Sequence, residues 1–422
     1  MSIFRAAFGD DAAVLDESNF QLLLLATVFP ILGTALVSPV LESLIAPLGA
    51  SPTSIGLVIS FATAPAIVVI PVSGVLADRY GRRPVLVVAL LLFGAGGSAI
   101  ALTTDFRAVL ALRAIQGVGF AGIVPTITAS IGDMFDGTTE VTGQGLRMLV
   151  NGVSGAVFPL LAGALVTVAW QYPFLLYAVA FPVALVVSLG FTEPTDDTAA
   201  EATTTAGAGY LRDLGTLVRY PRVAVLLLAR TLPVVVWIGF LTFNSLVVTR
   251  VMGGSPVQAG LLVAVGNVVF GVTSSQLDRI LSGFGGRFST LMIANLSLAV
   301  GFIGFLFTPA VSLALPWIVL AGAGFGISLS LYRSYMTTLA PESLRGGLVS
   351  LGAAGARITA TVTPVAMGSV IDAVTPLVGK TAALQTAGIA IAIIGGGGGG
   401  LCLLAAAAAG PPPDDRAELF HS

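Results

Sequence analysis

One short segment of the chain places a carboxylate and three arginines between two uncharged stretches. It reads GVLADRYGRRP and runs from Gly74 to Pro84. Asp78 can accept hydrogen bonds from a helix N-terminus or from an arginine, so it could latch one conformation of a helix bundle. Gly74 would allow two helices to approach closely. A cationic anchor at a membrane surface would also explain the arginines, but it would not explain Gly74, Asp78 and Gly81.

Arg113 is a second candidate for polar chemistry, because it begins the segment RAIQGVG inside an apolar stretch. Placing an arginine in a membrane-spanning helix costs about 3 kcal/mol, so its side chain is expected to face a bundle interior or a wet cavity. The alternative is a side chain that extends to the outer surface, since Arg113 lies about five residues inside the outer end of its span.

Three further arginines lie inside apolar stretches of the second half, namely Arg230, Arg333 and Arg357. Arg357 is the deepest, about ten residues into its helix, and a cation there needs a partner or a ligand. The carboxylates of Glu42 and Asp372 lie towards helix ends on the outer side. We therefore expect a positively charged central cavity that binds an anionic or zwitterionic solute through Arg357, aided by Arg230. Arginines that bond backbone carbonyls in kinked helices would explain the same residues equally well.

The residue types of most enzyme sites are missing from the sequence. The one cysteine, Cys402, lies in the last apolar stretch, and the one histidine, His421, is next to the end. This excludes His/Cys metal clusters and histidine proton relays. GVGFAG at 117–122 has nucleotide-binding spacing but lies inside an apolar stretch, and GKT at 379–381 lacks the first glycine of a phosphate loop. We expect no enzyme activity, no metal or other cofactor and no ATP, and without a Lys/Arg cluster no nucleic acid.

The elements that position these residues are membrane-spanning helices. Hydrophobic residues make up 56% of the chain and charged residues 9%, against roughly a quarter charged in soluble domains. About 20 apolar residues cross a bilayer as a helix, and these stretches are continuously apolar rather than alternating as in a barrel. The sequence therefore predicts an all-α integral membrane protein with twelve spans. We place them near 20–43, 54–77, 84–104, 108–131, 148–169, 173–192, 223–248, 256–277, 288–308, 312–332, 347–371 and 382–406.

Charge asymmetry between the loops orients these spans. With both termini on one side, ten arginines lie in the loops of that side, and three cationic residues lie in the opposite loops. Both termini are therefore expected to be cytoplasmic. The predicted parts are a cytoplasmic segment 1–19, a six-helix bundle 20–192, a cytoplasmic linker 193–222, a second six-helix bundle 223–406 and a cytoplasmic tail 407–422. The linker contains TDDTAAEATTTAGAG, which buries too little apolar surface to order itself, so we expect a mobile tether.

The two halves repeat one another weakly at an offset of about 200 residues. Asp78-Arg79 recurs as Asp278-Arg279, and GVGF at 117–120 recurs as GAGF at 322–325. Transporters are commonly built from two such units, with a binding site between them near the membrane midplane. The repeat predicts two pseudo-symmetric bundles and a second latch at Asp278 and Arg279.

Two of these segments resemble motifs of the major facilitator superfamily. GVLADRYGRRP is similar to its loop signature, with matches at Gly74, Asp78, Arg79, Gly81, Arg82 and Arg83. RAIQGVG is similar to its fourth-span motif, with matches at Arg113, Gln116, Gly117 and Gly119. WQYPF at 170–174 and APESLRG at 340–346 extend the resemblance over nearly the whole chain. It implies the fold of two six-helix bundles, a latch at the loop and a part for Arg113 in coupling, often of protons.

The sequence of the fifth span bears on which branch of this superfamily the chain resembles. The drug/proton antiporter branch of this superfamily typically carries GxxxGPxxGG there. The corresponding stretch here is SGAVFPLLAG, which keeps Pro159 and Gly163 but has Ser154, Phe158 and Ala162 where glycines are expected. The second copy of the loop signature is also eroded, because Ser274 stands in the glycine position.

These observations lead to a functional expectation. The chain should move a small-molecule substrate across the cell membrane by alternating access, with proton-coupled efflux of a drug-like compound or metabolite as the first expectation. Proton symport or uniport of an anionic or zwitterionic metabolite is the alternative, and a non-transporting sensor or assembly factor is a third. The partners would be the solute, protons and the lipid bilayer, and a monomer would contain the complete pathway.

Overall fold

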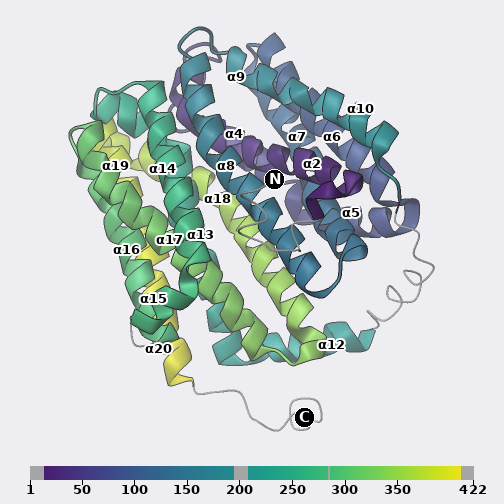
Figure 1. Ribbon diagram of the computed structural model, residues 1–422. Coiled ribbons are helices and arrows are strands. Elements are labelled where there is room, and N and C mark those ends of the chain that lie inside the picture. The colour runs from purple at the N-terminus through teal and green to yellow at the C-terminus, as the bar shows by residue number, and fades with distance from the viewer. Residues whose placement is uncertain (1–13, 194–207, 284–285, 410–422) are drawn as a thin grey trace. The chain divides into compact units, whose positions relative to one another are not determined.

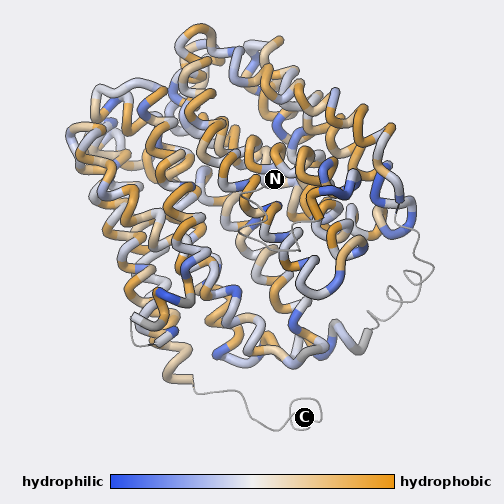
Figure 2. The backbone as a smooth tube through the Cα atoms, viewed as in Figure 1, coloured by the Kyte–Doolittle hydropathy of each residue, from blue (hydrophilic) through white to orange (hydrophobic). Residues whose placement is uncertain are grey.

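The computed structural model describes residues 14–193, 208–283 and 286–409, and every regular element within these ranges is helical. Twelve helical runs in the described chain are long and apolar enough to cross a membrane, as the sequence predicts. Figure 2 shows hydrophobic residues along most of their lengths and hydrophilic residues gathered towards helix ends and loops. The predicted all-α class and the number of spans are both confirmed.

The helices of the first half form six spans, some of them built from two or three consecutive pieces. They are α2 (Ser18–Ala35), η2 (Ser38–Val40), α3 (Leu41–Leu44), α4 (Leu57–Thr63), α5 (Ala66–Tyr80), α6 (Arg82–Ser98), η3 (Ala99–Leu102), α7 (Phe106–Met134), α8 (Gly137–Leu165), α9 (Tyr172–Leu175), η4 (Leu176–Val179) and α10 (Ala180–Gly190).

The second half repeats this arrangement and adds short helices outside the spans. Its helices are α12 (Ala208–Arg219), α13 (Pro221–Leu246), η5 (Val247–Val251), α14 (Pro256–Ser275), α15 (Leu277–Gly283), α16 (Arg287–Phe307), α17 (Val311–Leu339), η6 (Glu342–Leu344), α18 (Arg345–Val378), α19 (Lys380–Ala392), η7 (Ile393–Gly397) and α20 (Gly398–Ala408). The pieces η5 and η7 are π-helical.

Several helices are longer than the predicted spans. α8 begins at Gly137 rather than near residue 148, α17 ends at Leu339 rather than near 332, and α18 ends at Val378 rather than near 371. An apolar stretch marks the part of a helix that contacts lipid. A helix satisfies its own backbone groups and can therefore continue into water, where polar residues such as Glu140 are tolerated.

The prediction of a mobile tether is wrong for residues 208–219, which form α12. Tyr210, Leu214, Leu217 and Val218 recur at helical spacing, and they pack into a core cluster with residues of α13, α17, α18 and α20. A one-sided apolar stripe of this kind stabilises a surface helix by burial. Most of the TDDTAAEATTTAGAG stretch lies outside the described residues.

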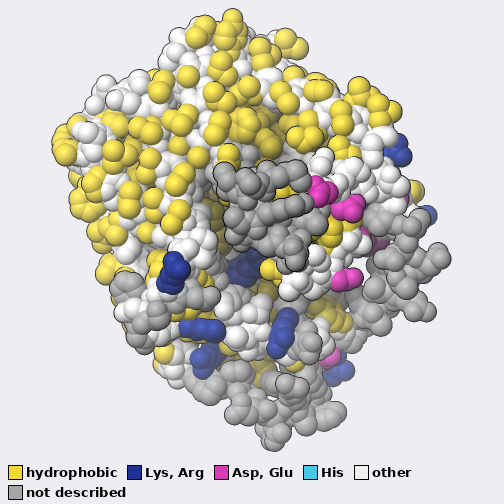
Figure 3. Space-filling view, in the orientation of Figure 1, with side chains coloured by type: hydrophobic (Ala, Val, Ile, Leu, Met, Phe, Trp, Pro, Cys, Tyr) yellow, Lys and Arg dark blue, Asp and Glu magenta, His cyan; other side chains and the backbone are white. Residues whose placement is uncertain are grey.

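The chain folds as two compact units. The N-terminal unit comprises the described residues of Met1–Asp197 together with Asn244–Leu246 and Ser255–Ala264. The C-terminal unit comprises the described residues of Thr198–Phe243, Val247–Gly254 and Val265–Ser422. Figure 1 colours the first mainly purple to blue and the second mainly green to yellow. On the face of the C-terminal unit in Figure 3, hydrophobic side chains cover α16 and the part of α14 after Ala264. Lys and Arg gather near the end that carries α12 and α15.

The internal repeat is visible in the packing of each unit. A Cβ on Gly119 of α7 would overlap the Phe93 nitrogen of α6 and lie 2.5 Å from the Ala89 carbonyl oxygen. A Cβ on Gly324 of α17 would lie 2.5 Å from the Ala294 carbonyl oxygen of α16. The two glycines are 205 residues apart, as are Gly96 and Gly301, which face α7 and α17 in the same way. The third and fourth spans of both units therefore cross backbone against backbone.

Candidate functional site

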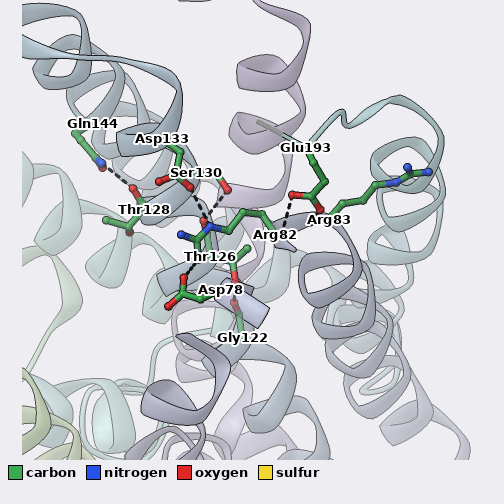
Figure 4. Close-up of polar contacts among 10 residues, drawn as sticks. All are labelled: Asp78, Arg82, Arg83, Gly122, Thr126, Thr128, Ser130, Asp133, Gln144 and Glu193. Carbon is green, nitrogen blue, oxygen red and sulfur yellow. Dashed lines mark hydrogen bonds and ion pairs between the residues drawn. The ribbon is translucent and has the colours of Figure 1, made fainter. Parts of the chain in front are cut away.

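An ion network joins the ends of α5, α6 and α7 in the N-terminal unit (Figure 4). Arg82, the first residue of α6, donates from Nη1 to Asp78 Oδ1 at 2.6 Å and from Nε to Asp133 Oδ2 at 2.9 Å. The Arg82 side chain is 16% exposed, so most of it is covered by its neighbours. The structure thus brings together two of the predicted latch residues and adds Asp133. Sequence reasoning missed Asp133 because its position near the end of α7 carries no motif.

Glu193 caps the helix that follows the latch. Its Oε2 accepts from the Arg82 backbone N–H at 3.0 Å, and its Oε1 accepts from the Arg83 backbone N–H at 2.7 Å. The Arg83 side chain bonds the Ser188 carbonyl oxygen. Gly81 has a φ of 95°, and a Cβ there would lie 2.5 Å from Glu193 Oε1. Glycine is therefore needed at position 81 both for its backbone conformation and for the approach of the carboxylate.

Replacing Glu193 with alanine should destabilise the protein by about 1 kcal/mol, because two N–H groups at a helix start lose their acceptor and the helix dipole loses a nearby negative charge. Thermal unfolding of the purified protein would measure this loss. Asp136→Ala is the matched control, because Asp136 precedes α8 without a side-chain capping bond. Equal unfolding temperatures for both variants would contradict the capping role.

Two other residues of the loop signature make few contacts in this structure. A Cβ on Gly74 would meet nothing within 4 Å, so the expected close helix approach at this glycine is absent here. Arg79 lies with its guanidinium carbon 5.4 Å from the centroid of the Tyr80 ring, which is within the range of a cation–π contact. The predicted parts of Gly74 and Arg79 in a latch remain predictions.

Arg113 is fully buried inside the N-terminal unit. Its Nε donates to the Val58 carbonyl oxygen of α4 at 2.9 Å, and its Nη2 donates to the Gly33 carbonyl oxygen of α2 at 2.6 Å. Nη1 bonds Gln116 Oε1, one turn along α7. The side chain therefore points into the bundle and does not extend to the surface, and its positive charge is held by neutral acceptors.

A small pocket lies beside this arginine. It is lined by Gly33, Thr34, Ala62, Thr63, Phe93, Gln116, Gly117 and Phe120. Gln116 is 1% exposed, and its Nε2 has no hydrogen-bond partner among the described residues. Gly117 packs against the Ala62 carbonyl oxygen, which brings α7 and α4 into close contact. Gln116 thus links the pocket lining to the buried cation, because its Oε1 accepts from Arg113.

The residues of the degenerate fifth-span motif lie in α8. Ser154 is buried, and a Cβ on Gly163 would overlap the Pro256 carbonyl oxygen. A Cβ on Gly260 would in turn overlap the Pro159 carbonyl oxygen. All of these residues belong to the N-terminal unit. Pro159 and Gly163 therefore retain a close helix contact although the other glycines of the motif are replaced.

The second-half candidates are only partly described. The Asp278 side chain lies outside the described part of the structure, while Arg279 Nη1 donates to Gln276 Oε1 at 2.8 Å. Arg357 lies half-buried in α18. Arg230 is 7% exposed and donates from Nη1 to the Val349 carbonyl oxygen at 3.1 Å. The residues before Arg230 and Arg333, namely Ala229 and Tyr332, pack into one core cluster, which the spacing of the sequence does not reveal.

Comparison with curated proteins finds an exporter and a putative multidrug resistance protein that match parts of the chain. The bacillibactin exporter of Bacillus subtilis (strain 168) is 34% identical over 150 residues, which is 34% of this chain and 37% of that protein. The putative multidrug resistance protein MdtD of Escherichia coli O139:H28 is 32% identical over 164 residues, 38% of this chain and 35% of that protein. The chain thus spans little more than a third of the length of each.

Comparison with solved structures finds the same architecture over most of the chain. An inward-facing bacterial homologue of the lysosomal transporter Spinster has a TM-score of 0.74 at 19% identity and covers 92% of this chain and 95% of its own. The D-xylose-proton symporter has a TM-score of 0.71 at 16% identity, with 89% and 96% covered. The family profile described as Major Facilitator Superfamily matches residues 23–364. With this match over most of its length, the chain belongs to the Major Facilitator Superfamily of membrane transporters.

Proposed function

We propose that this transporter exports a small drug-like compound or metabolite in exchange for protons. The observation that carries the proposal is the buried guanidinium of Arg113, which adjoins a pocket and is bonded to uncharged acceptors. A fixed positive charge in a low-dielectric bundle acts strongly on any proton or charged group that enters it. Such a charge can make the binding of a solute and of a proton depend on one another.

The relatives support the direction of transport. One matching region lies in a protein named as an exporter of bacillibactin, and another lies in a protein named for multidrug resistance. We assign the chain to the plasma membrane as a monomer with both termini in the cytoplasm, because the cationic loops predict that orientation. Flux measured in vesicles with an imposed pH gradient of either sign would test both direction and coupling.

The ion network of Asp78, Arg82 and Asp133 gives a prediction in which proton flux changes while stability does not. Asp78→Asn should lower solute-driven proton flux at least fivefold, since the coupling that a conformational latch provides typically falls in that range. Stability should change by less than about 1 kcal/mol, because Asp78 is partly exposed and exposed ion pairs contribute little. Asp136→Asn is the control, being an exposed carboxylate near the start of α8. Unchanged flux in Asp78→Asn would refute the latch.

Proton symport or uniport of an anionic or zwitterionic metabolite is the second candidate. It is favoured by the arginines of the C-terminal unit, including Arg230 and Arg357, and by the structural similarity to a D-xylose-proton symporter. Counterflow of solute with and without a pH gradient would separate the modes. Antiport predicts acidification of the vesicle side from which solute leaves, symport predicts the reverse, and uniport predicts no dependence on the gradient.

The primary experiment is proton release or uptake by reconstituted protein on addition of a solute panel. A solute-dependent proton flux that is lost in Arg113→Gln would support coupled transport. Flux without proton movement would favour uniport. Absence of flux for every solute would favour the third interpretation, a non-transporting sensor or assembly factor, since the fold alone does not fix function.

A further inference from the structure

Arg230 in the C-terminal unit has fewer hydrogen-bond acceptors around it than its guanidinium group can use. One guanidinium nitrogen, Nη1, bonds the Val349 carbonyl oxygen of α18. Nε is buried and has no partner among the described residues. The guanidinium lies directly on Gly352, where a Cβ would overlap Nη1 and lie 2.9 Å from Cζ. A buried N–H of a charged group that lacks an acceptor is costly, so a partner is expected.

Arg333 adds a second positive charge to the same place. It lies on α17 with an exposed side chain. The residue before it, Tyr332, packs into the same core cluster as Ala229, the residue before Arg230, so the two arginines lie on helices that pack together at this level. Neither arginine forms an ion pair with an acidic side chain that the structure describes. Two like charges that approach without a carboxylate between them are destabilising unless an anion neutralises them.

Both arginines lie at one end of the unit, at a similar depth. Arg230 is nine residues from the start of α13 and Arg333 six residues from the end of α17, which correspond to about 13 and 9 Å at the helical rise. Gly352, seven residues into α18, is about 10 Å deep. The three helix ends share a core cluster that includes Val223, Met336 and Leu348, so these depths are measured from the same end.

We propose that Arg230 and Arg333 form a binding site for one oxyanion group, such as a sulfate, a phosphate or a carboxylate. The unpartnered Nε of Arg230 and the exposed guanidinium of Arg333 would donate to separate oxygens of the anion, and arginine is suited to such planar recognition. Gly352 is required because a side chain there would displace the Arg230 guanidinium. Binding of an anion at this site does not depend on the proposed function. The assignment of that anion to a transported solute does rest on the proposed function.

The anion could be carried by a solute or by the headgroup of an anionic lipid. Equilibrium binding of radiolabelled sulfate to the full chain, reconstituted in neutral phosphatidylcholine vesicles, is the direct test. We expect Arg333→Gln and Gly352→Ala each to weaken binding about tenfold, as for loss of a charge-assisted hydrogen bond. Gly352→Ala keeps every charge, so it reports the position of Arg230 alone. Arg287→Gln, an exposed arginine of the same unit, should bind as the wild type does.

Repeating the assay in vesicles that contain phosphatidylglycerol distinguishes the two sources. The surface charge weakens sulfate binding equally in all variants, so the ratio of wild-type to Arg333→Gln affinity is the readout. A preserved ratio supports a solute site, whereas a ratio near one supports the same site occupied by lipid phosphate. No saturable binding by the wild type in neutral vesicles, or equal binding by both variants there, would overturn the proposal. Anion binding without proton-coupled flux would uphold the site and refute antiport.

Discussion

Arg113→Gln should reduce solute-driven proton flux about a hundredfold while leaving the protein folded. The reduction corresponds to the upper range of coupling free energies between two sites. Glutamine keeps a polar group near the Gly33 and Val58 carbonyl oxygens but removes the positive charge from the bundle interior. Proton flux per folded molecule in reconstituted vesicles is the measurement.

The stability of Arg113→Gln should lie within about 1 kcal/mol of the wild type, because two effects oppose each other. The variant loses three hydrogen bonds to neutral acceptors. It also removes the free-energy cost of burying a cation, for which the described residues provide no carboxylate partner. A side chain kept for packing would behave differently, since its removal would lower stability without changing flux per molecule.

Arg107→Gln is the matched control for this experiment. Arg107 lies on the same helix, α7, but near its start and exposed. The control should change neither flux nor unfolding temperature. If Arg113→Gln lost several kcal/mol of stability while the surviving folded protein transported normally, Arg113 would be a structural residue and the proposed coupling role would be wrong.

Gly119→Val should destabilise the protein by more than about 3 kcal/mol, because overpacking against fixed backbone exceeds what side-chain rearrangement relieves. The obstacles at this position are the backbone of Phe93 and the carbonyl oxygen of Ala89, neither of which can rotate away. The helices α6 and α7 would have to separate along their contact. Yield of monodisperse protein and its thermal unfolding temperature would report the effect.

Gly145→Ala is the control that replaces a helical glycine at a position where a Cβ has room. Gly145 lies inside α8, and a Cβ there would meet nothing within 4 Å. Alanine at this position should leave stability unchanged or raise it by up to about 1 kcal/mol, since it is the better helix former. Gly324→Val should repeat the loss seen for Gly119→Val, because it meets the same kind of backbone contact in the C-terminal unit. A normal unfolding temperature for Gly119→Val would refute the close crossing.

The sequence predicts the helices well because a bilayer imposes one strong rule on them. An uncharged stretch of sufficient length must be helical, so the twelve spans and their approximate order follow from composition. Their ends do not follow, as α8 shows, because no such rule acts on a helix in water. The amphipathic α12 was not predicted, because low-complexity residues precede it in the chain.

The site residues divide in a similar way. Arg113 could be placed inside a bundle from its cost in lipid, and the structure buries it. Asp133 and Glu193 could not be assigned to Arg82, because a pairing between residues 51 or more positions apart depends on helix rotation and tilt. The shared cluster of Ala229 and Tyr332, next to Arg230 and Arg333, could not be predicted for the same reason, since spacing along a chain does not determine which helix faces meet.

Glu193 is the last described residue before residues 194–207, and its carboxylate is bound to the first turn of α6. The connection towards the C-terminal unit is thus fastened at two points, through the backbone to α10 and through this side chain to α6. Glu193→Ala would therefore remove two hydrogen bonds that join the residues after α10 to the start of α6, beside the Asp78–Arg82–Asp133 network.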